Sequence, residues 1–334
     1  MMMRRLLNVC TLFLVLLLVT GCKPDPKSES STTIEKTTRR KVPKFDQERA
    51  YANIQKQVDF GPRYPGTDAH RQLIAYLKSE LEKYSDKVVT QDFKVDFLDE
   101  KNVDATNIIG VVNPKKRKRI LLAAHFDTRK IAEKDEDTSK QNEPILGADD
   151  GGSGVGVLLE IARLVKENGI DIGIDYVLFD AEDNGDSNGD QDTWCLGSMH
   201  WAKNPHVANY RADFGILLDL VGAKDAVFGK EDWSKQAAGK YLDKIWTLAE
   251  RMSFGNYFQN VSSGSVMDDH INVIQYRRMP MIDIINMSED RDGKKFGHYH
   301  HTHKDNMDII DKNTLRAVGK VVTATLYNYN NGTL

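Results

Sequence analysis

Hydrophobic residues along this chain follow two patterns. Four short runs are almost entirely apolar, and they lie at 120–124, 176–179, 214–218 and 281–285. Such runs are typical of strands that are covered on both faces, as in a parallel sheet. Longer segments carry hydrophobic residues at helical spacing, at 46–58, 67–83, 155–167, 236–252 and 314–327. The alternation predicts an α/β fold with a mainly parallel central sheet flanked by helices.

Two further segments, 88–97 and 107–112, have the composition of strands, and the sequence contains no internal repeat. The length that remains from residue 44 to the end suits one large domain. We therefore expect a single α/β catalytic domain over 44–334. The net charge of −3 indicates no nucleic-acid partner.

The first residues are typical of an export signal. Arg4 and Arg5 precede an apolar run at 9–19, which ends in Thr-Gly followed by Cys22. The run is too short to span a bilayer, and a cysteine at this place is typical of a bacterial lipoprotein signal. We expect residues 1–21 to be removed and Cys22 to carry a lipid anchor. The protein would then be exported and attached to the bacterial cell envelope, in the periplasm or at the outer membrane. The alternative is an ordinary signal peptide with an incidental cysteine.

The residues that follow the signal predict a flexible tether over 22–43, because they are rich in Lys, Ser, Thr and Pro. Cys10 leaves with the signal and Cys22 carries the lipid, so Cys195 has no partner for an internal disulfide. A polar, acidic segment at 129–144 is either a lid over a site or a surface insertion.

Acidic and imidazole side chains follow three of the apolar runs. They are His125, Asp127, Asp180, Glu182, Asp183 and Asp219. The carboxyl ends of parallel strands line one edge of a sheet, and ligands bind at that edge. A single polar residue at a strand end is commonly structural, but several at the same edge indicate a functional site.

Five segments carry the candidate chemistry: AAHFD (123–127), GADDGGSG (147–154), FDAEDNG (179–185), LLDLVGA (217–223) and HHTHKDN (300–306). Catalytic zinc is bound by imidazole nitrogen and carboxylate oxygen, with one position left open. Residues of these types are His125, Asp150, Asp183, Asp219 and His301. Glu182 is a candidate proton shuttle beside them.

Each segment also has a structural interpretation. GADDGGSG lacks the Gly-Lys-Ser/Thr ending of a phosphate loop, and it could be a strand-to-helix turn in which Asp149 or Asp150 caps the helix. The Glu182-Asp183 pair could be a charged turn, and the histidines at 298–303 could form a solvated loop. These interpretations do not explain why the segments occur together in this order.

From about residue 44 to the end, the ordered segments resemble the zinc aminopeptidase family, with His-x-Asp, Gly-Ala-Asp-Asp, an acidic pair, Leu-Asp and a late His-Thr-x-x-Asp. Within that family the sequence looks like a bacterial relative of the animal-type glutaminyl-peptide cyclotransferases. LLDLVGA and HTHKDN (301–306) fit that branch, although aminopeptidases come close to both. Asp268 in MDDHI is the sharpest feature, since hydrolytic relatives usually carry Ser there.

The resemblance implies a specific site and reaction. The ligands of one zinc ion per chain would be Asp150, Asp183 and His301. Glu182 would be the general acid/base, and Asp219 and Asp268 would form a hydrogen-bonded pair that shares a proton. The enzyme would convert amino-terminal glutamine of peptides or proteins to pyroglutamate with release of ammonia, and we expect it to act as a monomer.

The resemblance leaves three positions less certain in their roles. His125 would hold the rim in place or bind a second metal. Trp194, with Trp233 behind it, would form an aromatic wall of the substrate pocket, although ordinary packing would also account for each. The animal enzymes carry Glu, Trp and His at the positions of Asp183, His300 and Asp283.

Two other functions remain open. In a two-zinc aminopeptidase, His125 and Asp219 would bind a second zinc, Asp150 would bridge the two ions, and a hydroxide would attack the first peptide bond. Asp268 is the feature against it. In a lipoprotein that only binds peptides or metal, the proton shuttle Glu182 would have no use.

Overall fold

The computed structural model describes residues 39–289 and 295–334. The predicted signal peptide and most of the predicted tether lie outside the described residues. The last tether residues belong to the domain, because the Arg40 guanidinium pairs with Asp171 at 2.8 Å and the backbone N–H of Arg40 donates to the side-chain oxygen of Asn331 at 3.0 Å. In the described part, no helix has the length and apolar character needed to cross a membrane.

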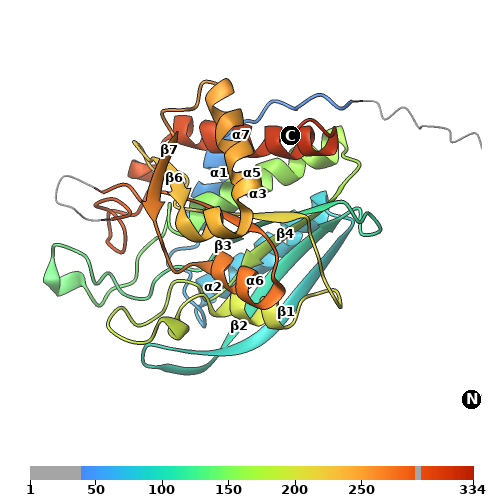
Figure 1. The fold of residues 1–334 in the computed structure, drawn as a ribbon. Coiled ribbons are helices and arrows are strands. Elements are labelled where there is room, and N and C mark those ends of the chain that lie inside the picture. The colour runs from blue at the N-terminus through green and yellow to red at the C-terminus, as the bar shows by residue number, and fades with distance from the viewer. Residues whose placement is uncertain (1–38, 290–294) are drawn as a thin grey trace, which may run out of the picture. The chain divides into compact units, whose positions relative to one another are not determined.

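A mixed sheet of six strands forms the centre of the described part, in the order β1-β2-β4-β3-β5-β8 (Figure 1). The strands are β1 (Lys87–Phe97), β2 (Glu100–Val112), β3 (Arg119–His125), β4 (Gly173–Phe179), β5 (Phe214–Asp219) and β8 (Met281–Ile285). β4, β3, β5 and β8 run parallel, and β1 and β2 form an antiparallel edge. A separate parallel pair joins β6 (Phe228–Glu231) to β7 (Phe258–Gly264).

Helices cover both faces of the sheet. They are α1 (Gln47–Val58), α2 (Asp68–Tyr84), α3 (Gly152–Asn168), α4 (Leu196–Lys203), α5 (Asp232–Arg251), α6 (Asp269–Arg277) and α7 (Lys312–Asn330). The larger hydrophobic core joins α1, α2, α3, α5 and α7 to one face, and a smaller core joins α4 and α6 to the other. Figure 1 shows α3, α5 and α7 on one side of the sheet and α6 on the other.

The expected fold class is confirmed, and each predicted strand and helix is present near its expected bounds, except that β2 starts earlier than expected, at Glu100 instead of Asn107. The apolar runs succeed as predictors because β3, β4, β5 and β8 are buried at every position. The sequence pattern missed α4, α6, β6 and β7. The strand β7 is polar and largely exposed, and α6 buries Asp269, His270 and Asn272 in place of an apolar stripe.

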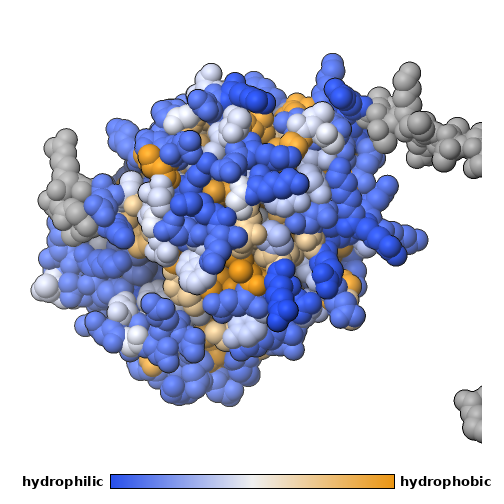
Figure 2. Space-filling view, viewed as in Figure 1, coloured by the Kyte–Doolittle hydropathy of each residue, from blue (hydrophilic) through white to orange (hydrophobic). Residues whose placement is uncertain are grey.

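Hydrophilic side chains cover most of the face seen in Figure 2. The large hydrophobic side chains that are exposed come from separate parts of the chain: Val42, Val207, Trp233, Val261 and Tyr276. Most hydrophobic side chains of the described residues are therefore buried. They pack against the strands whose carboxyl ends are followed by the polar residues of the site.

Candidate active site

A cavity of about 400 Å³ opens at the carboxyl ends of β4, β5 and β8. Its lining includes the acidic residues Asp150, Glu182, Asp183, Asp219 and Asp268, and the imidazoles of His300 and His301. The predicted ligands, the predicted proton shuttle and the predicted carboxyl pair therefore meet in one place. Segments that are far apart in the sequence converge there because the strands are parallel.

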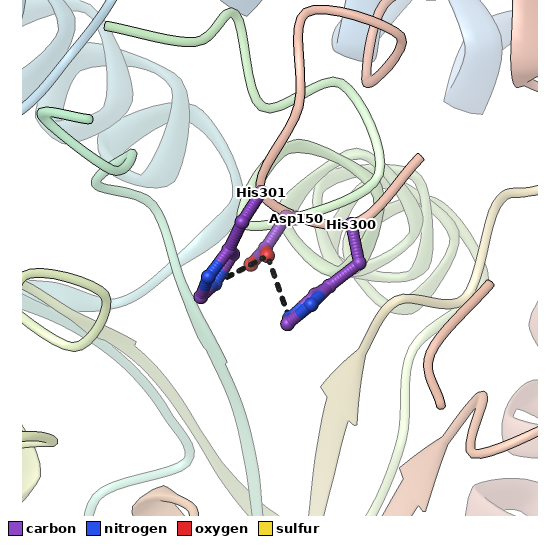
Figure 3. Close-up of side chains that lie close together, drawn as sticks. All are labelled: Asp150, His300 and His301. Carbon is purple, nitrogen blue, oxygen red and sulfur yellow. Dashed lines mark ion pairs between the residues drawn. The ribbon is translucent and has the colours of Figure 1, made fainter. Parts of the chain in front are cut away.

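The three predicted zinc ligands lie close together. The Nε2 atom of His301 is 3.0 Å from Oδ1 of Asp183 and 3.7 Å from Oδ2 of Asp150. Figure 3 shows Asp150 between His301 and His300, and the Nε2 atom of His300 is 3.6 Å from the same Asp150 oxygen. The other oxygen of Asp183 is buried and has no hydrogen-bond partner among the described residues. Such an orphaned acceptor, on a carboxylate whose other oxygen contacts an imidazole, fits a bound cation.

Two buried carboxylates that lie outside the predicted ligand set hold these residues in place. Asp127 accepts hydrogen bonds from the backbone N–H groups of Glu182 and Asp183, at 2.9 and 3.2 Å. Asp305 accepts from the backbone N–H groups of Asp149 and Asp150, at 2.8 and 3.1 Å. The sequence placed Asp127 and Asp305 in the motifs, but only the folded chain shows that they act by orienting the loops.

Several residues at or next to the cavity have a strained backbone. Residues in the left-handed region include Ala181 directly before Glu182, Leu220 directly after Asp219, and His301 itself, with φ of 54°, 49° and 56°. Each such non-glycine conformation costs about 1–3 kcal/mol and persists only where the surroundings enforce it. The strain is consistent with side chains that are aimed at a site.

Glu182 has the environment of a proton carrier. Its side chain is buried, and the Cys195 thiol donates a hydrogen bond to Oε1 at 3.2 Å. Burial raises the pKa of Glu182 well above its ordinary range, against the opposing charge of His125. A carboxyl group with a raised pKa can take up and return a proton near neutral pH.

His125 lies between two acids. Its Nε2 atom is 3.2 Å from Oδ1 of Asp150 and 3.2 Å from Oδ1 of Asp219. Burial alone would lower the pKa of His125, but hydrogen bonds with Asp127, Asp150 and Asp219 outweigh it and raise the pKa well above the ordinary value. The imidazolium therefore bridges Asp150 and Asp219, although the same three residues could also surround a second metal ion.

Asp219 and Asp268 both line the cavity and repel each other electrostatically. Burial raises the pKa of Asp219 to about 8, and the charge of Asp268 acts in the same direction. Asp268 accepts a hydrogen bond from the backbone N–H of Asp269, and its carboxylate lies within 4.8 Å of Asp283 in the middle of β8. The expected hydrogen bond between Asp219 and Asp268 stays a prediction.

The sequence profile of Peptidase family M28 matches residues 107–326, which is more than half of the chain. The chain belongs to peptidase family M28. The match begins in β2 and ends in α7, so it includes every motif at the cavity.

Several solved structures of similar proteins have the same fold. The glutaminyl cyclase of Tannerella forsythia is 48% identical, with a TM-score of 0.83 over 86% of this chain and 99% of that chain. A Zn-dependent exopeptidase from Parabacteroides distasonis is 47% identical, with a TM-score of 0.83 over 86% and 100%. Among curated relatives, the glutaminyl-peptide cyclotransferase of Bos taurus is 25% identical over 67% of this chain and 66% of its own length.

The two predicted pocket tryptophans have different positions in this family member. Trp194 lines the cavity, and its ring stacks on His301 with centroids 6.0 Å apart and an interplanar angle of 7°. Trp233 is 41% exposed in the first turn of α5 and is not among the described residues that line the cavity. The position of Trp233 at the start of α5, beside β6, gives its predicted role in the pocket wall no support, and that role stays a prediction.

Sequence reasoning missed several residues of the cavity wall, and two of them contact or lie beside the histidine loop. Lys134 and Phe296 line it, and the Lys134 ammonium is 2.6 Å from Nδ1 of His300. Lys134 comes from the polar segment 129–144, whose composition gave no sign of which surface it would cover. For His300, the histidine-rich motif at 300–306 was the signal in the sequence that could have indicated a place at the cavity. The sequence analysis noted His300 only because the animal enzymes carry Trp at that position.

Proposed function

We propose that this protein is a zinc-dependent glutaminyl-peptide cyclotransferase that forms pyroglutamate from amino-terminal glutamine. The observation that carries the proposal is the convergence of Asp150, Asp183 and His301 beside Glu182, with Asp268 at the same cavity. The similarity to solved glutaminyl cyclases at 44–48% identity over almost their whole length supports it.

The residues present fit one zinc ion. Asp150, Asp183 and His301 offer two carboxylates and one imidazole, which is a donor set of catalytic zinc with an open position. When bound, zinc polarises the side-chain amide carbonyl of the substrate as a Lewis acid. The place of a second ion lies beside His125, whose imidazole already bridges Asp150 and Asp219. We therefore propose one zinc per chain.

The protein side chains then move one proton. Glu182 takes a proton from the substrate α-amine, and the amine nitrogen attacks the side-chain amide carbon. A carbon–nitrogen bond closes the five-membered ring, the bond to the amide nitrogen breaks, and Glu182 returns the proton to the departing ammonia. Asp219 and Asp268 are placed to hydrogen-bond the amine or the departing nitrogen. Well-oriented intramolecular attack contributes about 7–11 kcal/mol, so orientation is the main task of the cavity.

An aminopeptidase is the second candidate, and one observation favours it. His125, Asp150 and Asp219 place their ligand atoms within 4.8 Å of one another, as a second metal would require. Similar proteins include one whose structure is named an exopeptidase. Metal content separates the two functions, because one tightly bound zinc per chain agrees with the cyclase and two agree with the hydrolase.

The test is mass spectrometry of a glutamine-initiated peptide incubated with the purified protein, with and without a zinc chelator. We expect a product that has lost one ammonia with its chain intact, and we expect the chelator to prevent its formation. The Glu182→Gln variant should lose turnover by at least about 10²-fold while zinc stays bound. A product shortened by its first residue would identify the aminopeptidase and overturn the proposal.

A further inference from the structure

The acidic segment at 129–144 packs against the loop that carries the metal-ligand histidine. Four successive residues of the segment, Glu133 to Glu136, pair with residues of the loop 300–304. The pairs are Glu133 with His301, Lys134 with His300, Asp135 with His303, and Glu136 with Lys304, at 2.8, 2.6, 2.8 and 2.9 Å. The segment is therefore neither a free surface insertion nor a detached lid. We call residues 133–136 the clamp.

Glu133 is the member of the clamp that reaches a metal ligand. Its Oε1 atom is 2.8 Å from Nδ1 of His301, and it also accepts a hydrogen bond from the Ser187 hydroxyl at 2.8 Å. Its Oε2 atom accepts from Nε of Arg129 at 2.7 Å, and the Arg129 side chain is fully buried. Arg129 in turn donates to the backbone carbonyl of Asp183 at 2.7 Å. Both oxygens of Glu133 are therefore held by fixed partners.

This arrangement determines which nitrogen of His301 is available to a metal. An ionised carboxylate can only accept hydrogen bonds, so Nδ1 of His301 must carry the proton that Glu133 accepts. The Nε2 atom then keeps its lone pair, and it is this atom that faces Asp183 and Asp150. A carboxylate on the far nitrogen of a ligating histidine fixes its tautomer and ring orientation and strengthens it as a ligand.

The ring of His301 is also held on its faces. Trp194 stacks on one side at 6.0 Å, and His300 stacks at 3.8 Å. The Arg129 guanidinium lies 4.6 Å from the Trp194 ring centroid, so Arg129 supports both Glu133 and the stacked tryptophan. With φ of 56°, His301 has a backbone conformation that requires such enforcement.

We infer that Glu133 is a positioning residue for zinc, and that the clamp holds His301 in its metal-binding tautomer and orientation. The inference rests on the zinc site of the proposed function and not on the reaction that the site catalyses. It assigns a role to a residue that lies outside every motif recognised in the sequence.

The test is the zinc affinity of Glu133→Gln and Glu133→Ala. Zinc-stripped proteins are titrated with zinc in competition with a chromophoric chelator, in the absence of any peptide. Loss of the carboxylate partner should weaken zinc binding by about 10- to 100-fold, with the larger effect for Glu133→Ala. Glu143→Gln is the matched control, because Glu143 belongs to the same segment but lies 3.8 Å from His303 and touches no metal ligand. It should bind zinc as the wild type does.

Thermal unfolding of the zinc-free proteins separates positioning from folding. Zinc-free Glu133→Gln should unfold near the wild-type temperature although its zinc affinity is reduced. Wild-type affinity in both Glu133 variants, or a loss of affinity that Glu143→Gln shares, would overturn the inference. The titration contains no substrate, so it tests zinc binding apart from the reaction. If zinc affinity depends on Glu133 but the protein forms no pyroglutamate, only the proposed reaction is contradicted.

Discussion

At the scale of single residues, the site is a group of acids that would repel one another without a cation. Glu182, Asp183 and Asp219 all have raised pKa values, for which burial is the largest cause. Asp150 has a lowered pKa because hydrogen bonding and charge from His125, with the charges of the loop histidines, outweigh burial. Asp150 differs from the other acids because three histidines, His125, His300 and His301, act on it together.

Asp219 should make the stability of the zinc-free protein depend on pH. Its pKa is raised from 3.8 to about 8, so between these values the folded state keeps a proton that the unfolded state has lost. Its contribution to stability is therefore complete below pH 3.8 and is lost as pH rises towards 8. Between pH 5 and pH 8 the wild type should lose about 3–4 kcal/mol of unfolding free energy that Asp219→Asn keeps. Urea unfolding at both pH values measures this difference, and equal pH dependence in the two proteins would contradict it.

At the scale of elements, the close approach of α3 to the sheet places Asp150 at the rim. The helix starts just after the Asp149-Asp150 pair, and Gly151 has φ of 84°, a conformation that suits glycine. Gly154 faces β5, where an added Cβ would collide with the carbonyl oxygen of Leu218 and lie 2.9 Å from Cβ of Ala124. The glycines of GADDGGSG therefore serve the turn and the helix–sheet contact.

Gly154→Ala should destabilise the fold by about 1–3 kcal/mol or more, because neither a backbone oxygen nor a methyl group can move aside cheaply. Gly239→Ala in α5 is the matched control, since nothing lies within 4 Å of its added Cβ. In the control, the free energy of unfolding should rise by about 0.5–1 kcal/mol, because alanine has a higher helix propensity than glycine. Urea unfolding of both variants measures the contrast, and similar effects at the two positions would show that the helix–sheet distance has been misjudged.

At the scale of the whole molecule, the cavity exists because parallel strands deliver distant segments to one edge. The residues nearest the metal position come from the loop before α3, the end of β4 and the loop at 300–304. A cation there would join these segments and offset the repulsion among their carboxylates. Zinc binding should therefore stabilise the folded domain as a unit.

Removal of zinc should lower the unfolding temperature, and its return should restore it. A ligand at 100 times its dissociation constant adds about 2.7 kcal/mol to the free energy of unfolding. Calorimetry measures the unfolding temperature of the protein in three samples. One contains chelator, the second contains chelator followed by excess zinc, and the third contains chelator followed by magnesium at the same concentration. Magnesium should restore little, because it prefers an oxygen octahedron to a site that includes imidazole. If the chelator leaves the unfolding temperature unchanged, the prediction of a bound zinc is contradicted.

Local patterns carried much of the prediction. The buried strands were visible because both faces of each strand are covered, which makes the run continuously apolar. Asp150, Glu182 and His301 were visible because each lies in a motif of characteristic residues at fixed spacing. The helix α6 was not visible, since three of its five buried residues are polar and interrupt the usual apolar stripe.

The sequence by itself determined the fold class, the rim of strand ends and the residues gathered there, because these depend on hydrophobic spacing and short motifs. Only the tertiary structure decided that Asp268 lies beside Asp283, that Trp233 is partly exposed and that Glu133 contacts His301. Each of these depends on how two segments far apart in the chain meet. Such a meeting is set by the packing of whole elements and the closure of loops, which no local pattern encodes.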